Sequence, residues 1–168
     1  MVFYYSYGKK TKIFAESLGE VLGCEVYELE SDLNSRGKFG FFIKALSLAF
    51  TGKGYPVSNI DKVKNVIAEN SPKEIFLCAP IWGGQMVGSP RYFLESFSDE
   101  TVNLKNVTVN LLLTASVPVE KYKQDALEFL NKIPCIAGEA YIFAASSKVP
   151  PEKETIMEHL REILKGEI

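Results

Sequence analysis

The chain has 168 residues, of which 46% are hydrophobic and 24% are charged, and its formal net charge is −2. This length and composition are typical of one globular domain with a sizeable core, so we expect a single domain spanning residues 1–168. The near balance of acidic and basic side chains leaves no basic footprint and argues against nucleic-acid binding.

The chain opens with a predicted strand, a tight loop and a helix. Residues 2–5 are apolar or aromatic, residues 6–11 are rich in hydroxyl groups, glycine and lysine, and apolar residues at helical spacing follow from Phe14. The N–H groups of such a loop and of the first helical turn converge where the helix dipole adds partial positive charge. The segment therefore predicts a phosphate site, although the same residues would also serve as a plain turn.

A strand, a linker and an apolar helix come next. Gly23 is typical of a helix C-cap, residues 24–30 alternate as a partly exposed strand should, and residues 31–38 form a polar linker. The helix that follows has apolar residues at Phe39, Phe42, Ile43, Leu46 and Phe50, and Phe41 and Leu48 widen this stripe. We expect the stripe to pack in the core, and a surface for a hydrophobic partner or ligand is the alternative.

The middle of the chain contains the strand that we expect to be buried on both faces. Residues 61–69 form a predicted helix, and residues 74–79 are a continuous apolar run typical of such a strand. The loop 80–88 follows with the one tryptophan, Trp82, and a further helix begins near Ser89 and Pro90. Trp82 could stack on an aromatic ligand there, or it could only cap the end of the sheet.

The same alternation continues to the end of the chain. Residues 106–113 form a strand that ends in a polar turn, residues 119–130 a helix, residues 140–144 the last strand, and apolar residues from 156 to 164 mark a closing helix. Alternating strands and helices require right-handed crossovers and a parallel sheet covered on both faces. The predicted fold is a doubly wound α/β three-layer sandwich with a five-stranded parallel sheet in the order 2-1-3-4-5.

Three loops should meet at one edge of this sheet. In the predicted order the first, third and fourth strands are neighbours, so the loops 6–11, 80–88 and 114–118 face one crevice, where ligands of open α/β sheets bind. Gly83 and Gly84 would let the backbone come close to a flat ligand there. The crevice is therefore the predicted functional site.

The cysteines and the histidine suggest neither a disulfide frame nor a metal site. Cys24, Cys78 and Cys135 are odd in number and far apart, and His159 stands alone among charged residues. No basic segment precedes the first strand, and the longest apolar stretch, residues 39–50, is too short to cross a bilayer. We expect a cytoplasmic protein with reduced thiols and no membrane span.

Two motifs resemble those of the flavodoxin-like family. Residues 6–11, Ser-Tyr-Gly-Lys-Lys-Thr, followed by Ala15 and Leu18, are similar to the family's phosphate loop. Residues 79–84, Ala-Pro-Ile-Trp-Gly-Gly, are similar to its second flavin loop, and the order and spacing of the elements match along essentially the whole chain. The chain departs from the family at the phosphate turn, where Gly8 precedes Lys9 and the family prefers a hydroxyl residue followed by glycine.

This resemblance implies FMN as the cofactor. The implied phosphate-binding residues are Ser6, Tyr7, Gly8, Lys9, Lys10 and Thr11. The isoalloxazine ring would lie against Pro80, Ile81, Trp82, Gly83 and Gly84, with Thr114, Ala115 and Ser116 on its other side. No catalytic residue and no metal ligand is expected, because the sequence supplies no obvious acid or base and FMN would carry the redox chemistry.

Three functions remain open at this stage. An FMN-binding carrier of the flavodoxin type, which passes electrons between partner proteins, is favoured. An NAD(P)H-dependent FMN reductase of quinones or other small molecules would need a hydrophobic floor over the flavin, which residues 39–50 and Tyr55 could provide. The departure at Lys9 leaves room for an interaction module with the same fold and no cofactor, and a homodimer through residues 39–50 is a further alternative.

Overall fold

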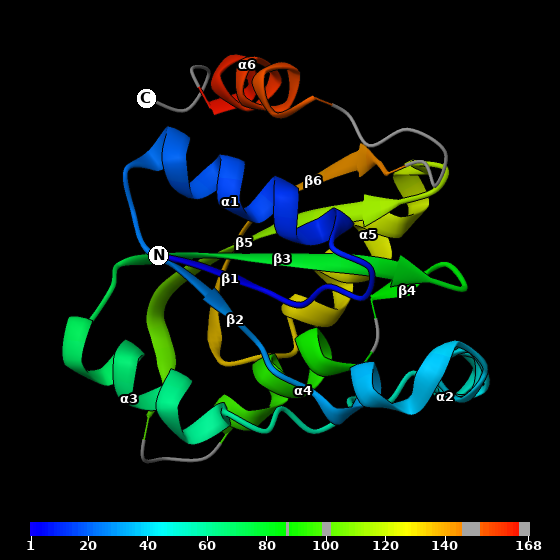
Figure 1. The fold of residues 1–168 in the computed structure, drawn as a ribbon. Coiled ribbons are helices and arrows are strands. Elements are labelled where there is room, and N and C mark those ends of the chain that lie inside the picture. Colours follow the sequence, from blue (N-terminus) through cyan, green and yellow to red (C-terminus); the bar gives the residue numbers. More distant parts are fainter. Residues whose placement is uncertain (87, 99–101, 146–151, 165–168) are drawn as a thin grey trace.

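The fold is a parallel β-sheet with helices on both of its faces (Figure 1). A computed structural model describes residues 1–86, 88–98, 102–145 and 152–164, and it describes residue 38 without its side chain. Val87 of the predicted loop 80–88 lies outside the described residues. Residues 99–101, 146–151 and 165–168 of the predicted domain 1–168 lie outside them as well.

Every predicted strand and helix is present, and three short elements were not predicted. The new elements are two 3₁₀ helices and a two-residue strand, β4, which forms a hairpin with the end of the central strand. The elements in chain order are β1 (Val2–Tyr4), α1 (Lys10–Leu22), β2 (Val26–Glu28), η1 (Asp32–Arg36), α2 (Gly37–Thr51), α3 (Ile60–Asn70), β3 (Glu74–Trp82), β4 (Gln85–Met86), α4 (Ser89–Glu95), η2 (Ser96–Ser98), β5 (Leu104–Ala115), α5 (Glu120–Leu130), β6 (Cys135–Ala144) and α6 (Lys153–Leu164).

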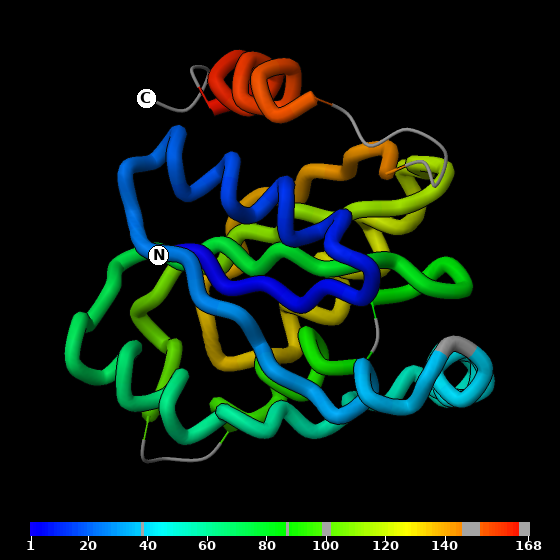
Figure 2. Tube along the Cα trace, in the orientation of Figure 1, coloured from blue at the N-terminus to red at the C-terminus, as the bar shows by residue number. Residues whose placement is uncertain are grey.

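The parallel strands run in the order β2-β1-β3-β5-β6, as the chain trace in Figure 2 lets the reader follow. Val2 of β1 pairs with Val26 on one side and with Phe76 of β3 on the other. Leu77 of β3 in turn pairs with Leu111 of β5. With β4 set aside as an antiparallel appendage of β3, the predicted strand order 2-1-3-4-5 is confirmed.

Successive residues of the inner strands point to opposite faces, so each strand contributes to two cores. In β1, Phe3 packs in a core completed by α2, α3, α4 and α5, whereas Val2 and Tyr4 pack in a second core completed by α1 and α6. In β3, Leu77 and Cys78 divide in the same way. This double burial explains why the sequence of β3 is a continuous apolar run.

The expectations for the cysteines, the histidine and the first helix cap are met in the described residues. All three cysteines are free, with Cys78 buried and the other two half-buried. His159 is exposed and its ring contacts Phe143 edge-on. Gly23 caps α1 in the left-handed conformation, with φ 60°. Among the described residues we find no helix long and apolar enough to cross a membrane.

The expectation that the apolar stripe of α2 packs in the core is wrong. The side chains of Phe39, Phe42 and Phe50 are 78%, 63% and 83% exposed, and Ile43 and Leu46 are exposed as well. The helix is apolar nearly all round, so periodicity alone does not select the buried side. The buried side is formed instead by the residues that fit closely against the sheet: Phe41, Ala45, Leu48 and Ala49.

Two leucines of α2 offer a matched test of this orientation. Leu48 is 4% exposed and Leu46 is 46% exposed. We expect Leu48→Ala to lower the free energy of unfolding by about 2–4 kcal/mol, because it leaves a cavity in the core. Leu46→Ala should lower it by less than about 1 kcal/mol. Urea unfolding of both variants would measure the difference, and equal losses would contradict the assigned orientation.

Candidate functional site

The three predicted loops meet at the carboxyl end of the sheet and enclose a cleft of about 310 Å³. Its lining comprises Tyr7, Gly8, Lys10, Thr11, Pro80, Ile81, Trp82, Thr114, Ala115, Ser116 and Ala145. The structure therefore brings together most of the predicted site residues from three separate strands. The predicted residues that do not line the cleft are Ser6, Lys9, Gly83 and Gly84, and each has its own surroundings.

The backbone turns sharply between β1 and α1. Gly8 and Lys9 both adopt positive φ values, 81° and 69°, and helix α1 begins at the next residue. No side chain in the described part of the chain caps the N-terminus of α1, so the N–H groups of its first turn are left for a ligand or for water. Consecutive N–H groups in such a turn, at the positive end of a helix dipole, form an anion-binding concavity.

Lys9 is an unusual residue for this conformation. A side chain at a left-handed position costs about 1–2 kcal/mol, and glycine normally occupies such positions. The phosphate turn of the resembled family has glycine where this chain has Lys9. In this chain Gly8 and Lys9 are both left-handed, so the turn contains a glycine one position earlier and a strained lysine after it. Strained backbone of this kind gathers at functional sites, where the surrounding structure holds it in place.

Ser6 precedes this turn in the chain and is buried, with 7% of its surface exposed. Its carbonyl oxygen accepts a hydrogen bond of 3.5 Å from Asn34 Nδ2, and Asn34 Oδ1 accepts one of 2.9 Å from the Tyr5 hydroxyl. Its own hydroxyl has no partner among the described residues. A buried polar group without a partner destabilises a protein by about 1–3 kcal/mol, so an oxygen ligand at this place would satisfy it.

Two hydrogen bonds tie the first loop to the far side of the cleft. The hydroxyls of Thr11 and Thr114 are 2.8 Å apart and both residues are buried. Lys10 Nζ donates a hydrogen bond of 3.1 Å to the carbonyl oxygen of Ala145, at the end of β6. These bonds hold the end of β1 against the ends of β5 and β6. Lys10 also places a positive charge in the cleft.

The second loop is a hairpin turn rather than an open loop. Trp82 is the last residue of β3 and pairs with Gln85, so Gly83 and Gly84 are the two turn residues. Both have positive φ, 57° and 84°, which a type I′ turn requires. A Cβ atom on Gly83 would lie 2.8 Å from that of Ala49. Ala49 therefore leaves no room for a side chain at Gly83.

The Trp82 ring is held edge-on by two other aromatic rings. Its ring centroid is 4.9 Å from that of Phe41 and 5.8 Å from that of Tyr5, at interplanar angles of 86° and 77°. Phe41 stacks in turn on Tyr7 of the first loop, with centroids 3.4 Å apart. Trp82 thus lines the cleft and also packs at the end of the sheet. The predicted packing at the end of the sheet is confirmed, and stacking of the ring on an aromatic ligand stays a prediction.

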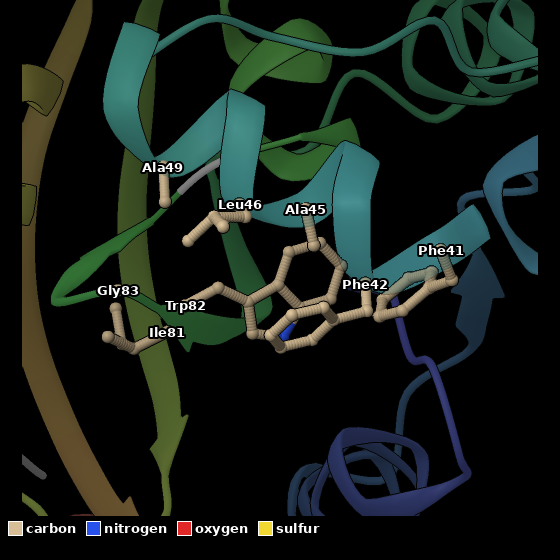
Figure 3. A pocket seen from close by; sticks show the side chains of 8 residues that line it. All are labelled: Phe41, Phe42, Ala45, Leu46, Ala49, Ile81, Trp82 and Gly83. Atoms are coloured by element: carbon tan, nitrogen blue, oxygen red, sulfur yellow. The ribbon is translucent and has the colours of Figure 1, made fainter. Parts of the chain in front are cut away.

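A second, apolar pocket of about 290 Å³ lies between α2 and the end of β3 (Figure 3). Its lining consists of Phe41, Phe42, Ala45, Leu46, Ala49, Ile81, Trp82 and Gly83. Ile81 and Trp82 also line the cleft, so the two cavities share a wall. Tyr55, which the sequence suggested for this floor, is instead buried and accepts a hydrogen bond from Arg36.

The sequence did not identify three residues that shape the site. Ala145 follows an apolar strand and carries no side-chain signal, and Asn34 stands in a segment that looked like a linker. Phe41 was visible as an apolar residue, but helical spacing did not show that it faces Trp82. Each takes part through tertiary contacts that no local pattern encodes.

The chemistry of the cleft is neutral or cationic. Its lining contains Lys10 and no aspartate or glutamate. Burial raises the pKa of the Tyr5 hydroxyl, so it remains protonated and continues to donate to Asn34. The described residues contain no group of three potential metal ligands. The arrangement is suited to holding an anion next to a flat ring, and it lacks a carboxylate that could act as a general base.

Comparisons with known proteins identify the fold. No protein-family model and no curated protein sequence matches the chain. Solved structures do match: the Trp repressor binding protein of Bacillus subtilis (TM-score 0.63, 13% identity) covers 98% of this chain and 99% of its own. The two-electron reduced flavodoxin of Megasphaera elsdenii (TM-score 0.52, 16% identity) covers 96% and 99%. A flavodoxin, WrbA-like protein of Agrobacterium tumefaciens (TM-score 0.54, 14% identity) covers 98% and 94%.

The strained turn gives a first test of the site. We expect Lys9→Gly to raise the free energy of unfolding by up to about 1 kcal/mol, because glycine removes the left-handed strain. Lys12→Gly, three residues further into α1, should lower it by about 1 kcal/mol because glycine weakens a helix interior. Thermal unfolding of both variants measures these two changes in stability. A destabilised Lys9→Gly variant would show that the turn is not strained.

Proposed function

We propose that this chain, which has the flavodoxin-like fold, is an FMN-binding redox protein that carries electrons between partner proteins. The observation that carries the proposal is the N-terminus of α1, which no side chain of the described residues caps, next to a cleft of suitable size. Ser6 precedes this turn, and its buried hydroxyl has no partner among the described residues. Flavodoxins among the structurally similar proteins support it. When bound, FMN would supply the one- and two-electron chemistry.

The phosphate of FMN fits the first loop. The N–H groups of the turn at Gly8 and Lys9 and of the first turn of α1 would donate to its oxygens, and the Ser6 hydroxyl would gain its missing partner. The ammonium group of Lys10 lies in the same cleft and would balance part of the phosphate charge. Lys9 is exposed and would add to that charge from outside. The lysine at this turn is thus compatible with a phosphate site.

The isoalloxazine ring fits between the second and third loops. Pro80, Ile81 and Trp82 would form one wall, and residues 114–116 the other. Gly83 and Gly84 have no side chains of their own, so the backbone N–H and C=O groups of this turn would be available to the edge of the ring. The edge-on contacts of Trp82 with Phe41 and Tyr5 would hold its indole in place.

The apolar second pocket favours one alternative, an NAD(P)H-dependent FMN reductase of quinones or other small molecules. The pocket shares Trp82 with the cleft, so an apolar acceptor bound there would lie beside the proposed ring site. A carrier and a reductase differ in their response to nicotinamides. Rapid bleaching of the bound flavin by NADH or NADPH would favour the reductase, whereas reduction only by a protein donor or dithionite would favour the carrier.

The phosphate assignment can be tested by comparing FMN with riboflavin, which lacks the phosphate. Trp82 is the one tryptophan and lines the cleft, so its fluorescence reports binding of either flavin. We expect wild-type protein to bind FMN at least about 100-fold more tightly than riboflavin, because charge-assisted hydrogen bonds to a phosphate are strong. Equal affinities, or no quenching by either flavin, would contradict the proposal.

Two buried serines provide a matched pair for the same titration. Ser6 and Ser17 both have buried hydroxyls without a partner in the described part of the chain, but only Ser6 lies in the proposed phosphate loop. We expect Ser6→Ala to weaken FMN about tenfold and to leave riboflavin unchanged. Ser17→Ala should change neither affinity. An equal loss of affinity for both flavins would show that Ser6 supports the fold around the cleft and does not bind the phosphate.

A further inference from the structure

Two buried threonines form a hydrogen bond across the cleft. Thr11 lies in the first turn of α1, Thr114 lies at the carboxyl end of β5, and both line the cleft. Their exposed fractions are 2% and 3%, and their hydroxyl oxygens are 2.8 Å apart. The two residues are 103 positions apart in the sequence. The fold thus brings two hydroxyl groups together at a place that is nearly closed to solvent.

This pair has one proton more than its hydrogen bond uses. Two hydroxyl groups carry two protons, and the bond between them takes up only one. Neither hydroxyl forms a further hydrogen bond to any described residue. A buried donor without an acceptor destabilises a protein, so the second proton needs an acceptor. Because both residues line the cleft, an oxygen of a bound ligand can be that acceptor.

The place of Thr11 determines which hydroxyl would donate to an anion. The geometry allows either threonine to be the donor within the pair. Thr11 belongs to the helical turn whose N–H groups would hold the phosphate, so its hydroxyl would lie beside the phosphate oxygens. A phosphate dianion accepts hydrogen bonds and donates none. The Thr11 proton would therefore turn to the phosphate, and the Thr114 hydroxyl would donate to Thr11 Oγ1.

The sheet holds Thr114 in place for this role. Thr114 pairs with Pro80 of β3 on one side and with Phe143 of β6 on the other. One residue further on, the N–H group of Ala145 donates a hydrogen bond of 2.7 Å to the carbonyl oxygen of Ala115. A donor that is already fixed loses little conformational entropy when a ligand binds.

We propose that Thr114 is a positioning residue for the phosphate: its hydroxyl donates to Thr11 Oγ1 and so directs the Thr11 proton to a phosphate oxygen. This inference rests on the proposed function and deepens it. The resemblance to the flavodoxin-like family implies Thr114 beside the isoalloxazine ring. In the structure its hydroxyl bonds to the first loop instead, which leaves Ala115 and Ser116 to border the ring on that side.

The test is a titration of FMN, riboflavin and inorganic phosphate into the wild type and its variants. We expect Thr114→Val, which removes the hydroxyl and keeps the shape, to weaken FMN and inorganic phosphate about fivefold and to change riboflavin less than about twofold. Thr114→Ser keeps the hydroxyl and should bind all three within about twofold of the wild type. Fluorescence of Trp82 measures the flavins, and calorimetry measures the phosphate.

A double variant separates positioning from direct contact. Thr11→Val should weaken FMN about tenfold, because it removes the donor itself. If Thr114 acts only through Thr11, the double variant Thr11→Val, Thr114→Val binds FMN as weakly as Thr11→Val alone. Losses that multiply, to about fiftyfold, would show that Thr114 contacts the flavin directly, and they would overturn the proposal.

A matched control and a second measurement make the outcome decisive. Thr108 lies in the first half of the same strand, so Thr108→Val should leave all three affinities unchanged. Circular dichroism verifies the fold of each variant. The proposal is overturned if Thr114→Val weakens riboflavin as much as FMN, because the hydroxyl would then only support the fold. Should a variant misfold, the methyl NMR signals of Thr11 and Thr114 in the wild type decide: both should shift with inorganic phosphate, and unmoved signals overturn the proposal.

Failure of the proposed function can be told apart from failure of this inference. A wild type that binds inorganic phosphate and not FMN would contradict the proposed function. The same order of variants in the phosphate titration would then still support the role of Thr114. A wild type that binds neither phosphate nor FMN would overturn both.

Discussion

The left-handed turn at Gly8 and Lys9 is the constraint on which the candidate site depends. It lets the chain leave β1 and enter α1 at once, so the N-terminus of the helix opens at the end of the central strands. Among the described residues, no side chain caps the first helical N–H groups, and the buried hydroxyl of Ser6 has no partner. An anion at the turn would accept hydrogen bonds from the helical N–H groups, and Lys9 adopts there a left-handed conformation that glycine would adopt with less strain.

The sheet order then determines which chemistry surrounds this turn. Because β3 and β5 follow β1 in the sheet, their carboxyl ends bring Trp82 and Thr114 to the same cleft. The Thr11–Thr114 contact and the bond from Lys10 to Ala145 fasten the first loop across it. The result is a cleft lined by Trp82 and Lys10, and the functional proposal rests on that combination of an aromatic wall and a positive charge.

Much of this could be predicted from the sequence, because local patterns encode it. The buried run of β3 and the alternation of strands and helices predicted a doubly wound parallel sheet. With the strand order 2-1-3-4-5 assumed for such a sheet, the three loops were placed at one edge. The sequence patterns gave wrong predictions where contacts between distant segments determine which side chains are buried. Helix α2 is apolar nearly all round, so its spacing did not show that Phe41 and Leu48 face inward while Phe39 and Phe50 face outward. The role of Ala145 likewise depends on a contact between segments far apart in the sequence. The hairpin at Gly83 and Gly84 is local, and the Gly-Gly pair was interpreted as room for a ligand although it is also typical of a two-residue turn.

Backbone amide chemical shifts during titration with inorganic phosphate test the central claim most directly, because the N–H groups themselves are observed and no flavin is required. The account predicts that the largest shift changes fall on residues 7–12, at the turn and the start of α1, and that FMN then competes for the same place. Shift changes spread over the surface lysines, or none in residues 7–12 at saturating phosphate, would contradict it.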